Sequence, residues 1–146
     1  MARHNDDYCA PYQFEVAGFQ TWKPDVDNTA HKFSLHFTFR ENVTTVVTEC
    51  NLNDTTHPEP GPRPDNERRF VCENPNVHFM WEDAGPGALT VIEQACPKQN
   101  GEPSGFEVSG TTRPEVECFA TEPSFALGAG TYCLSKTQYL LVNVTG

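Results

Sequence analysis

The chain has 146 residues and carries 20 acidic against 10 basic side chains, a formal net charge of −10 with neutral histidines. A chain of this length builds one domain, and its 37% of apolar residues, ten phenylalanines among them, suffice for one core. The negative charge argues against binding to nucleic acids or to anionic membranes, because both require clustered lysine and arginine.

Short segments in which every second residue is apolar recur along the whole chain. The clearest is 33–39, where phenylalanine and leucine alternate with polar residues. In chain order the pattern predicts strands at Gln13–Trp22, Phe33–Phe39, Val43–Cys50, Arg69–Cys72, Val77–Glu82, Leu89–Ala95, Phe106–Ser109, Val116–Phe119 and Tyr139–Val144. Turn signals rich in glycine and proline leave no room for a long helix. We therefore expect an all-β fold, an antiparallel β-sandwich or barrel of about nine strands, stapled by disulfides, with little or no helix.

The predicted domain spans residues 9–146 and follows residues 1–8, which we interpret as an N-terminal leader or as residues added for expression. No apolar run is long enough to predict a membrane span, and the N-terminal residues lack the apolar centre of a signal peptide. We interpret the chain as the mature form of a secreted protein. Residues 51–68 contain four prolines, which cannot donate to a sheet ladder, and predict one long loop outside the sheet.

The spacing of the cysteines is that of a disulfide framework, without a zinc-ligand pattern: they are Cys9, Cys50, Cys72, Cys96, Cys118 and Cys133. Cys50 and Cys72 end successive predicted strands, so a bond between them would close the base of the proline-rich loop. Cys118 and Cys133 bracket a glycine-rich segment, which leaves Cys9 for Cys96. Six cysteines allow many other pairings, so the spacing favours this set without excluding the rest.

Three Asn-x-Ser/Thr triplets, at Asn42, Asn53 and Asn143, are candidate glycosylation sites. Such sites are used only in a secretory pathway. Together with the cysteines they predict a secreted, extracellular protein.

No known catalytic motif occurs, and with all six cysteines assigned to bridges no free thiol nucleophile is expected. An alternative function is a small secreted hydrolase, such as a ribonuclease, that would draw on His36, His78, Glu82 and Arg40. Pairs of carboxylates for glycoside cleavage, Glu82 with Asp83 or Glu107 with Glu117, are expected by chance among so many acids. A metal site of His57, Glu59 and Asp65 has the same weakness, so we predict no catalytic residue, metal or cofactor.

Binding is the function that the composition favours, through tryptophans near strand ends and through the long loop. The candidate partner-binding residues are Trp22, Trp81, His57 and Arg63. Trp81 alternates with Val77 and Phe79, which favours a position in the core, whereas Trp22 is equally consistent with core and surface. A carbohydrate- or small-ligand-binding module that uses exposed aromatic rings is a further alternative.

The order of these features resembles the AA1-like family of small secreted fungal proteins, named for the major Alternaria allergen. The resemblance covers most of the chain: an aromatic first strand (Phe14–Phe19), an alternating strand (Phe33–Phe39), a strand ending at Cys50, the segments Phe70–Asn74 and Val77–Trp81, a Leu-Thr-Val-Ile strand, and Cys118 to Cys133 before a terminal strand. Cys96 and the proline-rich loop depart from the pattern.

The family resemblance implies a barrel-like antiparallel fold with disulfides Cys50–Cys72 and Cys118–Cys133. It also implies a secreted effector or elicitor that binds a host protein, such as a plant defence protein, without enzymatic activity. An N-terminal cysteine is associated with dimerisation in the allergen. Here Cys9 has a candidate internal partner in Cys96, so we expect a monomer rather than a covalent dimer.

Overall fold

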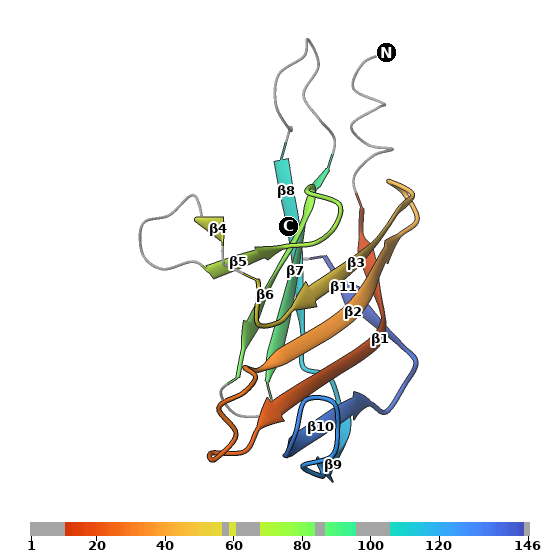
Figure 1. Cartoon of the computed structure of the whole chain (residues 1–146). Coiled ribbons are helices and arrows are strands. Elements are labelled where there is room, and N and C mark those ends of the chain that lie inside the picture. The colour runs from red at the N-terminus through yellow and green to blue at the C-terminus, as the bar shows by residue number, and fades with distance from the viewer. Residues whose placement is uncertain (1–10, 57–58, 61–67, 84–86, 96–105, 145–146) are drawn as a thin grey trace, which may run out of the picture.

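The computed structural model describes residues 11–56, 59–60, 68–83, 87–95 and 106–144, and it confirms an all-β fold (Figure 1). Within these ranges there is no helix, and hence none long and apolar enough to cross a membrane. The strands described are β1 (Gln13–Pro24), β2 (Ser34–Glu41), β3 (Val46–Leu52), β4 (Glu59–Pro60), β5 (Arg68–Val71), β6 (Val77–Glu82), β7 (Ala88–Ala95), β8 (Phe106–Thr112), β9 (Val116–Thr121), β10 (Gly130–Ser135) and β11 (Tyr139–Asn143).

The strands form two antiparallel sheets that pack as a sandwich (Figure 1). The first sheet has the order β3-β2-β1-β10-β9, with β11 also paired to β1, and the second has the order β4-β5-β6-β7-β8. Of the two expected architectures, the structure is therefore the sandwich.

The long strand β1 organises the first sheet because two later strands share one of its edges. Its first half pairs with β11, where Phe14 faces Val142, and its second half pairs with β10, where Trp22 faces Tyr132. Between the halves the register with β2 shifts, and Gly18 adopts φ of 62°, a conformation that favours glycine. The bulge divides the sheet into a half that carries β11 and a half that carries β10 and β9.

The core lies between the two sheets and is built mainly from phenylalanine. Phe37 of the first sheet meets Phe79 of the second edge-on, with ring centroids 5.4 Å apart, and Phe14 packs on Phe39 at 5.1 Å. Other buried apolar residues include Val16, Phe19, Leu35, Val77, Leu89, Val91, Val108 and Val142. β10 contacts mainly β1 and β9, so these two strands extend the first sheet largely beyond this core, against which only the first residue of β9, Val116, packs.

Among the described residues there are two disulfides, and both belong to the set of three pairs that the spacing favours. Cys50–Cys72 is buried and links β3 of the first sheet to the residue after β5 of the second. Cys118–Cys133 joins the neighbouring strands β9 and β10, and Cys118 is exposed. Cys9 and Cys96 lie outside the described residues.

An acidic pair is buried where the β2–β3 turn meets β7. Glu93 is 1% exposed, and its Oε2 lies 2.7 Å from the hydroxyl of Thr44. The same hydroxyl lies 2.9 Å from Oε1 of Glu41, which is also buried. Burial, only partly offset by the Thr44 contact, together with the nearby Glu41 carboxylate raises the pKa of Glu93 to about 7.

Glu107 on the second sheet is paired with Arg69, whose side chain is buried. Both Nη atoms of Arg69 donate to the carboxylate of Glu107, at 2.6 and 3.1 Å. These hydrogen bonds lower the pKa of Glu107.

The observed strands differ from the sequence prediction at three places. Residues 43–45 form a turn rather than the start of a strand, and Thr45 has φ of 59°. The segment predicted as one loop, 51–68, begins with the last two residues of β3 and contains β4. The strand β10 was not predicted, so the described residues hold eleven strands where about nine were expected.

Candidate functional site

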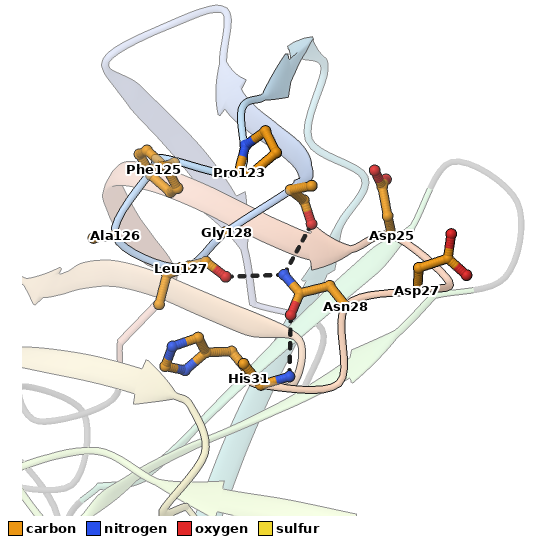
Figure 2. A pocket seen from close by; sticks show the side chains of 11 residues that line it. Asp25, Asp27, Asn28, His31, Pro123, Phe125, Ala126, Leu127 and Gly128 are labelled. Atoms are coloured by element: carbon orange, nitrogen blue, oxygen red, sulfur yellow. Dashed lines mark hydrogen bonds between the residues drawn. The ribbon is translucent and has the colours of Figure 1, made fainter.

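The segment between β9 and β10, residues 122–129, folds back over the outer face of β1; we call it the 122–129 loop (Figure 2). Two tight turns shape it, in which the backbone N–H of Phe125 donates to Glu122 and that of Gly128 donates to Phe125, at 2.9 and 2.8 Å. Gly128 has φ of 91°, where a side chain would be strained. The loop is therefore a defined structure rather than a loose connection.

Asn28, in the turn between β1 and β2, fastens this loop to the first sheet (Figure 2). Its Nδ2 donates to the carbonyl oxygens of Leu127 and Ala129, both at 3.0 Å. Its Oδ1 accepts the backbone N–H of Ala30, also at 3.0 Å, which fixes the orientation of the amide. One side chain thus connects two segments about a hundred residues apart in the sequence.

We expect Asn28→Ala to loosen the loop and to lower the free energy of unfolding by about 1–2 kcal/mol, because the carbonyls of Leu127 and Ala129 lose their donor. Amide exchange at Gly128 should accelerate while exchange at Phe37 in the core stays slow. Asn76→Ala is the matched control, since the Asn76 side chain is exposed and makes no hydrogen bond with any described residue. Unchanged exchange at Gly128 would contradict this role of Asn28.

The loop also covers Trp22, and this corrects the prediction that Trp22 binds a partner. Trp22 does lie on the outer face of the first sheet, opposite Ser34 in the register, but it is only 1% exposed. Its Nε1 donates to Oγ1 of Thr121 at 3.1 Å, and that hydroxyl donates to the carbonyl of Gly128 at 2.8 Å. Trp22 therefore supports the loop from below and is not accessible to a partner.

Three aromatic rings lie on the outside of this structure, and we call them the aromatic patch: Phe119, Phe125 and Tyr132. Phe119 is stacked on Tyr132 with centroids 5.4 Å apart, and Phe125 meets Tyr132 edge-on at 6.0 Å. The hydroxyl of Tyr132 donates to Oε1 of Gln20 and so holds the central ring. Phe119 is 52% exposed and Phe125 37%, so apolar ring surface faces solvent in a fixed arrangement.

A pocket of about 510 Å³ opens next to the patch, between the β1–β2 turn and the 122–129 loop (Figure 2). Phe125 lines one side of it, and Asp25 and Asp27 line the other. Neither carboxylate makes a hydrogen bond or ion pair with any residue that the structure describes. The patch is thus bordered by unneutralised negative charge.

The remaining candidate partner-binding residues are not at this site. Trp81 is partly buried and packs on Phe19 and Phe33, with centroids 5.6 and 6.2 Å away, in agreement with the core position that its alternation favoured. His57 and Arg63 lie outside the described residues.

The asparagines of the three glycosylation triplets are all exposed. Asn42 lies in the β2–β3 turn, and Asn143 is in β11, where its Oδ1 accepts from Gln13. Oδ1 of Asn53 accepts from Thr55 and Thr56 within a turn. Glycosylation of these residues stays a prediction.

The structure does not assemble the catalytic sets considered from the sequence. His36 and His78 lie on the outer faces of different sheets, separated by the core, and His36 is paired with Glu49 at 3.2 Å. Asp83 is bound to Lys23 at 3.1 Å.

Glu107 and Glu117 are in different sheets, so they cannot flank one sugar bond. Of the suggested metal ligands, His57 and Asp65 lie outside the described residues, and among those described no group of ligands for a metal occurs.

None of the three residues of the aromatic patch was among the binding residues predicted from the sequence. Phe119 was placed in a strand but not considered for binding, and Tyr132 lies in β10, which was not predicted. The two rings are neighbours because Phe119 and Tyr132 are opposite each other in the register of β9 and β10. The sequence offered one signal for the patch: Phe119 directly follows Cys118, and Tyr132 directly precedes Cys133.

No protein-family model matches the sequence, and no curated protein matches it significantly. Among solved structures, the fold is similar to the crystal structure of the Alternaria alternata major allergen Alt a 1, with a TM-score of 0.57 over 93% of this chain and 94% of that chain. The two sequences are 14% identical, so the likeness is one of fold. The resemblance inferred from the sequence is confirmed to that extent.

Proposed function

We propose that this protein, whose fold is that of the Alt a 1 allergen, is a secreted effector or elicitor that binds an extracellular protein of a host plant. The aromatic patch is its binding surface, and the protein acts without catalysis. The observation that carries the proposal is the exposure of Phe119 and Phe125 around a hydrogen-bonded Tyr132. Aromatic residues are enriched in the centres of protein interfaces, where a few of them supply most of the binding energy.

The rigidity of the patch supports this role. The Cys118–Cys133 bond, the Asn28 contacts and the buried Trp22 hold the three rings before any partner arrives. A surface that is ordered in advance loses little conformational entropy on binding. The disulfides are consistent with an oxidising, extracellular environment.

The double variant Phe119→Ser with Phe125→Ser tests the proposal. We expect the tagged protein to capture a defined protein from plant apoplastic fluid and the variant to bind that protein at least about 30-fold more weakly, because two exposed anchors are removed. Leu141→Ser on β11 is the matched control, since Leu141 is an exposed apolar residue outside the patch. Capture and surface plasmon resonance with the purified partner measure the effect.

Equal affinity of the double variant and the unmodified protein would refute the patch as the binding surface. Circular dichroism and thermal unfolding establish that the double variant is folded. Both substitutions remove exposed apolar rings outside the core, so we expect the fold to be kept.

A further inference from the structure

We propose that the free edge of β9 accepts an extended, basic segment of the partner protein as an additional strand of the first sheet. This inference rests on the proposed function and states how the partner is held. The aromatic patch lies beside this edge, because Phe119 belongs to β9 itself.

The backbone of β9 has hydrogen-bonding groups available on the side away from β10. β9 is the last strand of its sheet, and the Cα atoms of Cys118 and Cys133 are 4.0 Å apart. This short spacing is that of a pair without mutual backbone hydrogen bonds in an antiparallel ladder. The N–H and C=O groups of Cys118, and by alternation those of Val116 and Ala120, therefore point outward.

No residue in the described part of the chain hydrogen-bonds to these outward groups. Glu115, the residue before β9, supports this alternation. Its backbone is in phase with that of Glu117, which points toward β10, and its carbonyl accepts the N–H of Lys136 at 2.8 Å. Three consecutive outward positions offer the donors and acceptors that strand addition uses.

The edge also lacks the features that usually block pairing with another strand. β9 contains no proline, pairs with β10 over six residues without a register shift, and is largely exposed on both faces. Proteins commonly protect such edges with bulges, prolines or short strands. The edge of β9 is therefore open to pairing with a further strand, and it lies beside an ordered aromatic patch.

The charges around β9 identify the occupant as basic. Glu117 on β9 and Glu122 just after it are exposed, and Asp25 and Asp27 line the adjoining pocket. Of the nearby cations, Arg113 and Lys136 are at the other end of the strand, and Lys23, across β10 from Ala120, is bound to Asp83. Negative charge thus increases toward Thr121, where arginine side chains of a partner can also stack on the aromatic rings.

A second copy of this chain does not fit the same edge. Each copy carries a net charge of −10, and antiparallel pairing of two β9 strands would bring the Glu117 side chains of both copies to one interface. Repulsion between like charges opposes such a contact. The occupant is therefore a different protein that supplies positive charge.

The alternation of the sheet sets the pattern of the partner segment. Glu117 and Phe119 are on the outer face of β9, whereas Cys118 is on the opposite face. A segment with arginine at every second position and β-branched residues between them places its cations over Glu117 and the patch. A heptapeptide of alternating arginine and valine, with blocked ends, is the simplest probe of this geometry.

We expect the probe to bind saturably with a Kd below about 1 mM and to slow amide hydrogen exchange at Val116, Cys118 and Ala120. Ala120→Pro removes one outward N–H without removing a bond to β10, a position at which edge strands tolerate proline. This variant should bind the peptide at least about tenfold more weakly. NMR titration gives both the affinity and the exchange rates.

Two further measurements keep the test decisive if Ala120→Pro disturbs the fold. Glu117→Lys should also weaken binding about tenfold, while Glu82→Lys on β6 of the second sheet should leave it unchanged. A peptide with glutamate in place of arginine should not bind. Absence of saturable binding by the basic peptide, or equal binding of the acidic one, would overturn the inference.

The same variants separate this inference from the proposed function. If Ala120→Pro and Glu117→Lys still capture the host protein at full affinity while the Phe119→Ser and Phe125→Ser variant does not, strand addition is wrong and the patch remains the binding surface. If the patch variant and the edge variants all lose capture, both conclusions are supported. If none loses it, both are refuted.

Discussion

Replacing both Cys50 and Cys72 by alanine is expected to lower the free energy of unfolding by about 4 kcal/mol. The bond closes a loop with a sequence separation of 22, and the entropy that it removes from the unfolded chain accounts for about 3 kcal/mol. Its sulfur atoms are also buried in the core, so their loss leaves a cavity that costs about 1 kcal/mol more. Urea unfolding followed by tryptophan fluorescence measures the difference.

The matched control is the double replacement of Cys118 and Cys133 by alanine. That bond joins strands that are already paired, and Cys118 is exposed, so its removal leaves no cavity in the core. We expect a smaller loss, about 3 kcal/mol or less. Equal losses for the two pairs, or a larger loss for the second pair, would contradict the additional contribution of the buried Cys50 and Cys72 sulfur atoms.

Stability should fall as the pH rises from 4.5 to 7, because of Glu93. The pKa of Glu93 is about 7 in the folded chain against an ordinary value of 4.5. The folded chain therefore binds a proton that the unfolded chain has released. The stabilisation is complete below pH 4.5 and is lost as the pH rises through 7, by on the order of 3 kcal/mol.

The hydrogen bonds around Thr44 support a protonated Glu93. The hydroxyl of Thr44 has one proton, yet its oxygen lies within hydrogen-bonding distance of both Glu41 and Glu93. Both contacts are satisfied if the carboxylic acid of Glu93 donates to Thr44 and Thr44 donates to Glu41. Ionisation of Glu93 removes one donor and leaves two negative charges close together in a buried site.

Glu93→Gln isolates this effect, because the amide keeps a donor for Thr44 and cannot ionise. We expect the variant to be more stable than the unmodified protein at pH 8, by up to about 3 kcal/mol, and of nearly equal stability at pH 4.5. Comparing the two chains removes the contribution of groups such as Glu107, whose lowered pKa acts in the opposite direction. Glu82→Gln, at an exposed position, is the control.

A loss of stability for Glu93→Gln that is the same at both pH values would show that Glu93 stays ionised in the folded protein. Urea unfolding at the two pH values is sufficient to decide.

Strands that border the core were predictable because one of their faces is buried. The segment Val77–Glu82 has the predicted bounds, and the strand predicted at Phe33–Phe39 differs by only a few residues from β2. In both, alternating large apolar residues point between the sheets. The Cys50–Cys72 bond follows from such strands as well, since Cys50 lies in β3 and Cys72 directly follows β5.

The strand β10 was not predictable because it has no buried face. It extends the sheet beyond the core, and most of its residues, Gly130–Ser135, are exposed or partly exposed. Neither face has to be apolar, so its sequence shows no alternation of apolar and polar residues. The turn at Thr45 was missed for a different reason. A β-branched residue with positive φ gives no turn signal, and the neighbouring valines and threonines suggest a continuous strand.

The candidate site could be predicted only in part. The sequence left Trp22 open between core and surface, because the residue that binds its indole N–H, Thr121, is 99 positions away. The Asn28 contacts to the 122–129 loop span a similar distance. Sequence patterns report local geometry, and contacts at such separations depend on how the whole chain folds.

The position of the aromatic patch outside the core affects which substitutions this protein can tolerate. No residue of the aromatic patch belongs to the buried cluster of phenylalanines, so substitutions there leave the packing between the sheets intact. Related chains can therefore differ in this hairpin while retaining a common scaffold, because exposed positions tolerate substitution more readily than the interior.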